Sequence, residues 1–227
     1  VNWMQGTIGK TLADIDDSFV RYRISDALMQ AYKLFWDDFS GWYLEIIKPG
    51  YKEPMDGKTH RATLEIFETL MKIIHPFMPF ITEEIWQRLG ERTDGSSIMI
   101  ERMPEAGKFD AAMLNRFDTA REIVSAVRTI RKENNIANRD PLVLCAASGS
   151  TGEEFDEVIK RMCNLQEIRI VDGKVEGAVS FRIHTSEFFI PFGEGVDHDE
   201  EIRKMQEELT YTEGFLAAVV TKLSNEK

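Results

Sequence analysis

The stretch from residue 18 to residue 48 constrains the fold most, because it contains no proline and a single glycine, Gly41. Apolar side chains recur along it at three-, four- and seven-residue steps, as in a helix packed on a core: Ile24, Leu28, Ala31, Phe35, Trp42 and Ile46. A second row lies beside the first: Tyr32, Trp36, Phe39, Tyr43 and Ile47. We therefore expect one long helix with a wide apolar face, ended by Pro49 and Gly50.

Two further helices are expected before residue 105. The first runs over 61–75 and stops where Pro76 and Pro79 follow it, since proline removes a backbone donor and constrains the residue before it. The second begins at Thr82, a suitable N-cap, and ends near residue 89. His75, between an apolar helix and a proline, is interpreted as a hydrogen-bonded structural residue. Residues 1–105 therefore predict an antiparallel helical bundle.

The pattern changes after residue 105. A long helix is expected over 110–134 and a shorter one over 153–162. Short apolar runs predict strands at 142–147 and 168–171, and alternating residues predict a hairpin of 179–183 with 188–192. Residues 106–196 therefore read as a small α+β domain.

The last segment, 197–227, has a different repeat. Apolar residues occur there at alternating steps of three and four over three heptads, which is typical of a coiled coil: Ile202, Met205, Leu209, Thr212, Leu216, Val219 and Leu223. A single helix of this kind needs a partner to cover its seam. Its acidic start, 197–201, resembles a metal cluster, but carboxylates that complement a helix N-terminus are the preferred interpretation. The fold class is therefore mainly α: a helical bundle, a small α+β domain and a coiled-coil-type helix.

Composition excludes several classes of protein. The net charge is −11, which argues at first against nucleic acid as a partner, yet the segment 106–141 carries seven basic against five acidic residues. Two cysteines, Cys145 and Cys163, build neither a disulfide framework nor a cysteine-based zinc site. No apolar run approaches the roughly 20 residues of a membrane span, and no signal peptide is visible. We expect a cytoplasmic protein without membrane contact.

Few residues indicate catalysis. The sequence has no glycine-rich phosphate loop and none of the common hydrolase or metalloprotease motifs. Asp37 and Asp38 are adjacent, and neighbours on a helix diverge by about 100°, so they do not face one site. Aromatic rings near arginines suit base stacking and phosphate contact, although core packing is the simpler reading for most of the rings. The candidate contacts with RNA are Arg21, Arg23, Phe35, Trp36 and Phe39, then Arg121, Arg128, Arg131 and Lys132 on the basic segment.

One motif resembles a known family. Residues 75–86, His-Pro-Phe-Met-Pro-Phe-Ile-Thr-Glu-Glu-Ile-Trp, resemble the signature of the anticodon-binding domain of valyl-tRNA synthetases. The segment 36–45, the helix around 123–136 and the run from 189–191 into the heptad helix are similar to other parts of that family, in the same order. The resemblance covers essentially the whole chain.

This resemblance implies a function. Enzymes of the family attach valine to its tRNA with ATP and edit mischarged threonine, so the chain would be a C-terminal fragment that binds the anticodon region of valine tRNA. The family's catalytic motifs, His-Ile-Gly-His and Lys-Met-Ser-Lys-Ser, do not occur here. We therefore expect no activity and no cofactor in this fragment, with ATP and magnesium bound by the parent's catalytic domain. Its partners would be valine tRNA and the parent's catalytic and editing domains, and we expect a monomer.

Three alternatives stay open. The isoleucine and leucine enzymes are sibling families, but they differ around residues 75–86, and the isoleucine enzymes often end in a cysteine-rich zinc module. A non-enzymatic interaction module would use the heptad helix for assembly. An enzyme of another kind would need a clustered, buried titratable group or a metal.

Overall fold

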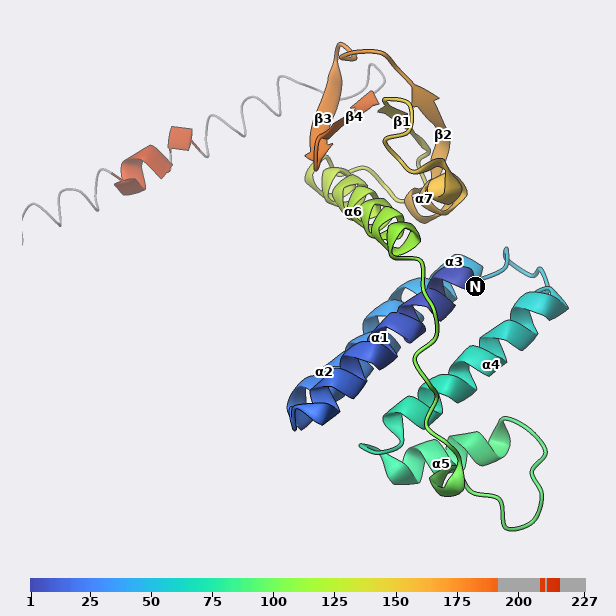
Figure 1. The fold of residues 1–227 in the computed structure, drawn as a ribbon. Helices are drawn as coiled ribbons and strands as arrows, with labels where there is room; N and C mark the ends of the chain where they lie inside the picture. The colour runs from blue at the N-terminus through green and yellow to red at the C-terminus, as the bar shows by residue number, and fades with distance from the viewer. Residues whose placement is uncertain (192–208, 211, 217–227) are drawn as a thin grey trace, which may run out of the picture.

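A computed structural model describes residues 1–191, 209–210 and 212–216, and its N-terminal half is a bundle of helices (Figure 1). The bundle elements are α1 (Asn2–Val20), α2 (Ile24–Lys33), the π-helix η1 (Leu34–Tyr43), α3 (Leu44–Ile47), α4 (Gly57–Ile74), α5 (Pro79–Arg88) and the short η2 (Ile98–Ile100). An extended segment then leads along the bundle to α6 (Ala111–Glu133), so the bundle expected before residue 105 is confirmed.

The chain reverses within the stretch that was expected to be one helix from residue 18. α1 ends at Val20, and Tyr22 takes a left-handed conformation with φ of 58°. The Arg23 amide donates to the Ser18 carbonyl at 2.8 Å, which closes the turn. α2 therefore packs back against α1. The expected start of the helix, residue 18, is wrong, because α2 begins six residues later at Ile24.

The helix that follows changes its hydrogen-bond period. Leu34–Tyr43 is a π-helix, in which backbone bonds run from i to i+5. Leu34 and Phe39, five residues apart, are both buried. The expected stripe is displaced as a result: Ile24 and Leu28 are exposed, at 58% and 42%, whereas Ala27, Ala31 and Leu34 face the core.

The α4–α5 corner is built by local hydrogen bonds. The Asp56 carboxylate accepts from the Thr59 amide at 2.9 Å and caps α4. Hydrogen bonding from the side chain of Thr59, and then from its amide, lowers the Asp56 pKa. α5 begins at Pro79, so Thr82 is not its N-cap but a buried residue in its first turn. Nδ1 of His75 lies 2.7 Å from the Thr82 hydroxyl, which confirms the structural role expected for this histidine.

A four-stranded sheet with two helices forms the second half of the chain (Figure 1). The elements are β1 (Leu142–Ala146), η3 (Glu153–Phe155), α7 (Asp156–Cys163), β2 (Leu165–Ile170), β3 (Ala178–Ile183) and β4 (Ser186–Pro191). The strand order is β2-β1-β4-β3, with β1 and β2 parallel and the other pairs antiparallel. α7 crosses over between the parallel strands, and α6 packs on α7 and β3. The α+β character and the hairpin are confirmed.

One aromatic side chain on α6 joins the two halves. The Phe117 ring, 1% exposed, lies 3.9 Å from the Trp3 ring of the bundle and 6.0 Å from that of Trp42. On its other side it meets Phe155 edge-on at 5.1 Å, just before α7. The core is therefore continuous from the bundle into the sheet unit.

The expected coiled coil falls largely outside the described residues. Of the segment 197–227, only 209–210 and 212–216 are described, and both pieces are helical. The acidic cluster 197–201 lies outside as well. Among the described residues, no helix combines the length and apolar character that a bilayer crossing requires.

Candidate nucleic-acid interface

Two aromatic rings form an exposed stack on the outer side of the bundle. Tyr32, at the end of α2, and Trp36, in η1, are 53% and 59% exposed, and their rings are nearly parallel with centroids 6.4 Å apart. Large rings left in solvent on a helix are available to stack unpaired bases. Trp36 is therefore the predicted bundle residue that the structure favours most as an RNA contact.

The two predicted arginines lie on the α1–α2 turn. Nε of Arg21 lies 3.0 Å from the Asp17 carboxylate, and Nη1 of Arg23 lies 4.0 Å from the Asp26 carboxylate. All four side chains are more than half exposed. Exposed pairs of this kind contribute about 0–1 kcal/mol, so either arginine can exchange its carboxylate for a phosphate at little cost.

The two predicted phenylalanines belong to the core. Phe39 is 4% exposed, and its ring stacks on those of Phe67 and Tyr43, both with centroids at 5.7 Å. Phe35 is half-buried, with its ring 6.3 Å from that of Phe67. Base stacking needs a free ring face, and the packing leaves Phe39 none. The prediction of Phe39 as a stacking residue is corrected for this reason.

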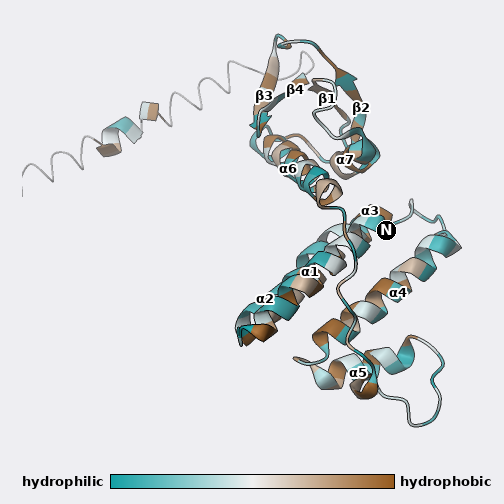
Figure 2. Cartoon of the chain, viewed as in Figure 1, coloured by the Kyte–Doolittle hydropathy of each residue, from teal (hydrophilic) through white to brown (hydrophobic). Residues whose placement is uncertain are grey.

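Further exposed aromatic residues gather at the end of the bundle that holds the α1–α2 turn. Tyr22 and Phe80 are each 90% exposed. The rings of Phe19 and Phe77 stack with their centroids 6.2 Å apart, which brings the α1–α2 and α4–α5 turns together. Tyr22 and Phe80 each follow one of these rings by three residues. Figure 2 shows hydrophobic residues at this end of the α1–α2 pair. Sequence spacing missed Tyr22 and Phe80, because it does not reveal which turns meet.

Arg121 is used within the fold. Its Nη1 lies 2.8 Å from the Asp38 carboxylate, and its guanidinium lies over the Trp42 ring at 5.0 Å. Burial raises the Asp38 pKa, and the neighbouring arginine opposes that rise. Asp37 is exposed while Asp38 turns to Arg121, so the expected divergence of this pair is confirmed. Arg121 thus ties η1 to α6, and its proposed phosphate contact stays a prediction.

Arg131 is also structural. It is 3% exposed, and it donates to the carbonyls of Ala137 at 2.9 Å, Cys163 at 2.8 Å and Asn164 at 3.3 Å. These bonds tie α6 to the C-terminal end of α7. A buried guanidinium cannot reach an RNA strand, so this prediction is corrected as well.

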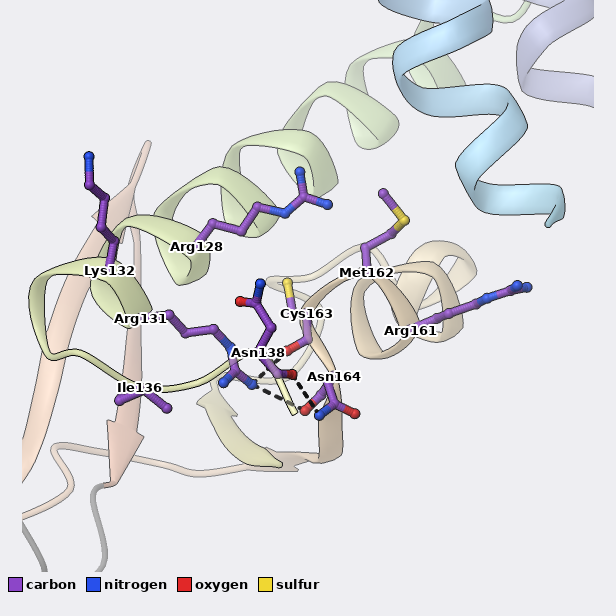
Figure 3. Close-up of a pocket in the computed structure, with 9 residues that line it drawn as sticks. All are labelled: Arg128, Arg131, Lys132, Ile136, Asn138, Arg161, Met162, Cys163 and Asn164. Carbon is purple, nitrogen blue, oxygen red and sulfur yellow. Dashed lines mark hydrogen bonds between the residues drawn. The ribbon is translucent and has the colours of Figure 1, made fainter. Parts of the chain in front are cut away.

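Arg128 and Lys132 remain exposed on α6, beside a hollow between α6 and α7 of about 570 Å³ (Figure 3). We call it the basic hollow and define it by its lining: Arg128, Arg131, Lys132, Ile136, Asn138, Arg161, Met162, Cys163 and Asn164. The Arg128 guanidinium also lies 6.0 Å from the centre of the Trp42 ring. The structure therefore splits the predicted residues into two surfaces, the aromatic stack on the bundle and the basic hollow at α6.

The described residues contain no group of three metal-ligating side chains close enough to hold an ion. Both thiols are buried, and burial raises the pKa of Cys145 and that of Cys163, the latter to about 11. Within the described part of the chain, binding through rings and cations is the chemistry that the surface side chains support best.

Comparison with known proteins places this geometry in a family. A family model described as the anticodon-binding domain of tRNA ligase matches residues 2–146. The valine–tRNA ligase of Parabacteroides distasonis is 50% identical over 226 residues, which cover 100% of this chain and 26% of that protein. Those of Bacteroides fragilis and Christiangramia forsetii are 48% and 46% identical, also over 100% of this chain. The chain spans about a quarter of the length of these curated relatives. The chain therefore belongs to the family of anticodon-binding domains of tRNA ligases.

Proposed function

We propose that this chain is the part of a valine–tRNA ligase that binds the anticodon region of valine tRNA. The observation that carries the proposal is the exposed Tyr32–Trp36 stack in a chain that matches an anticodon-binding domain. Arg21 and Arg23 lie on the exposed α1–α2 turn, at the opposite end of α2 from the stack. Unpaired loop bases stack on aromatic rings, and arginines neutralise the flanking phosphates. Relatives that are 46–50% identical and named valine–tRNA ligase favour valine over isoleucine and leucine.

The proposal extends to the whole enzyme. Valine activation with ATP and magnesium would take place in a catalytic domain of the parent chain, and this segment would bind tRNA without reacting. Its partners would be valine tRNA and the parent's catalytic and editing domains, in a cytoplasmic monomer. We further propose a division into an anticodon-binding bundle (1–105), a small α+β domain (106–196) and a coiled-coil arm (197–227).

A binding titration at low salt tests the proposal. We expect valine tRNA to bind more tightly than an unrelated tRNA, and Trp36→Ala to weaken that binding roughly tenfold, since one base stacked on a ring contributes about 1–3 kcal/mol. Tyr51→Ala is the matched control, because Tyr51 is 91% exposed but lies in the loop before α4, away from the stack.

Two results would contradict the proposal. Equal affinity for valine tRNA and an unrelated tRNA would exclude recognition of the anticodon. Equal losses in the Trp36→Ala and Tyr51→Ala variants would exclude the Tyr32–Trp36 stack as the binding surface.

A further inference from the structure

The basic hollow has an unusual charge composition. Four of its nine lining residues are cationic, Arg128, Arg131, Lys132 and Arg161, and none is acidic. In a chain with a net charge of −11, a lining without a carboxylate is a local exception. Like charges gathered around one space repel each other, and a bound anion relieves that repulsion.

These cations also lack carboxylate partners. Among the described residues, no Asp or Glu oxygen lies within 4.0 Å of the four lining cations, whereas Arg116 lies 2.9 Å from Glu154. Arg161 donates only to the Ile46 carbonyl, at 3.2 Å. Nε of Arg131 is buried and has no hydrogen-bond partner. Arg131 is only 3% exposed, so the exposed Arg128, Lys132 and Arg161 are the cations of the hollow that a ligand can meet.

The lining side chains are spread along the hollow (Figure 3). Arg128 projects from α6 towards α7, while Lys132 and Arg161 extend outward at opposite ends. The side-chain amides of Asn138 and Asn164 lie near Arg131, and Asn164 donates to the Asn138 carbonyl at 3.0 Å. Cations that spread in this way suit successive phosphates of a strand better than one small anion, which several cations would surround.

We propose that the basic hollow binds the phosphate backbone of the tRNA at a point outside the anticodon loop. This inference rests on the proposed function, because it needs tRNA as the ligand, but it concerns a second surface. Arg128 lies over the ring of Trp42, which belongs to η1, the element that also carries Trp36. An RNA that meets both surfaces would therefore bridge η1 and α6. Arg128, Lys132 and Arg161 neutralise phosphates, and the Asn138 and Asn164 amides offer further donors.

The test compares two double variants of the full chain, each lacking two positive charges. Arg128→Gln with Lys132→Gln removes exposed cations of the hollow; Arg139→Gln with Lys174→Gln removes exposed cations outside its lining. We expect the first variant to bind valine tRNA at least tenfold more weakly at low salt. Its slope of log affinity against log salt should fall by about 1–2, since each lost phosphate contact releases one counterion fewer. The control should change by less than twofold.

Two further measurements identify the ligand and the place of contact. Inorganic phosphate should displace tRNA only at tens of millimolar. Phosphate ethylation of the tRNA should interfere with binding by the wild type, but not by the hollow variant, at positions outside the anticodon loop. Circular dichroism and urea unfolding should be unchanged in both variants, because the four replaced side chains are exposed.

The outcomes separate this inference from the proposed function. If valine tRNA binds and Trp36→Ala weakens it, while the hollow variant matches its control, the hollow is not an RNA site and the proposed function stands. If inorganic phosphate binds below 1 mM without displacing tRNA, the hollow is a site for a small phosphate and the inference is wrong. If no tRNA binds to the wild type, the proposed function itself fails.

Discussion

Single residues in this chain take their roles from their surroundings. Arg128 and Arg131 lie three positions apart on α6, and both were candidate phosphate contacts. Arg128 is exposed at the basic hollow, whereas Arg131 is 3% exposed and donates hydrogen bonds to three backbone carbonyls. The same guanidinium group is open to solvent in one place and packed in the other, and solvent access decides which of the two a phosphate could reach.

Cys163 provides a residue-scale test that depends on pH. Burial raises the pKa of its thiol to about 11, and only the thiolate reacts with an alkylating agent. At pH 8 about one thiol in a thousand is then ionised, so native protein should label very slowly with iodoacetamide, and faster as the pH approaches 11. Mass spectrometry checks this, with urea-unfolded protein as the control, in which both cysteines should label readily. Rapid labelling of native Cys163 at pH 8 would contradict its burial.

The raised pKa of Cys163 also makes the free energy of unfolding depend on pH. The native state keeps the proton at pH values where the unfolded state has lost it. Its contribution to the free energy of unfolding is therefore complete below about pH 9 and decreases as the pH rises towards 11.

At the scale of one element, η1 determines what the bundle shows to solvent. Its i to i+5 period places Phe39 inside and leaves Trp36 outside, three residues earlier. π-helical turns occur often at functional sites, because they redirect side chains within an otherwise regular helix. Here the redirected residues include Asp38 and Trp42, which both contact Arg121.

Truncation of two rings in η1 tests this assignment. Phe39→Ala should lower the free energy of unfolding by about 3–5 kcal/mol, because it leaves a cavity among Phe35, Tyr43 and Phe67. Trp36→Ala should change it by less than about 0.5 kcal/mol, since the ring is 59% exposed. Urea unfolding followed by circular dichroism measures both variants. Similar losses in the two would mean that η1 does not orient its side chains as described.

At the scale of the whole molecule, Phe117 makes the bundle and the sheet unit depend on each other. Its ring contacts Trp3, Trp42 and Phe155, which belong to both halves. The Arg121–Asp38 pair and the Arg161–Ile46 hydrogen bond cross the same boundary. We therefore expect the two halves to unfold in one cooperative transition.

The Phe117→Ala variant tests this coupling. The truncation should cost about 3–5 kcal/mol, because the ring is 1% exposed and the space it leaves is shared by both halves. Urea unfolding should be followed with two probes, near-UV absorption for the bundle tryptophans and the labelling of Cys145 for the sheet. In the wild type the two transitions should coincide. Separate midpoints in the wild type would show that the halves unfold independently.

Much of the fold was predictable from local pattern. The helix expected at 110–134 is Ala111–Glu133, and the strand expected at 142–147 is Leu142–Ala146. Long periodic segments and bounded apolar runs define such elements, because the spacing of apolar residues along the chain does not depend on which other segments pack against them. The start of α2 was missed, since nothing local marks Tyr22 as a left-handed residue. The buried face of α2 was missed because a period of 3.6 does not hold through η1.

By itself, the sequence determined the helical bundle, the α+β unit and the resemblance that led to the tRNA ligase family. All three depend on the spacing of residues close together in the chain and on short motifs. Only the tertiary structure decided which candidates are free to touch RNA. It buried Phe39 and Arg131, paired Arg121 with Asp38, exposed Trp36, and brought Arg128, Lys132 and Arg161 to one hollow. The physical reason is that exposure and ion pairing depend on which distant segments pack together, and no local pattern encodes that choice.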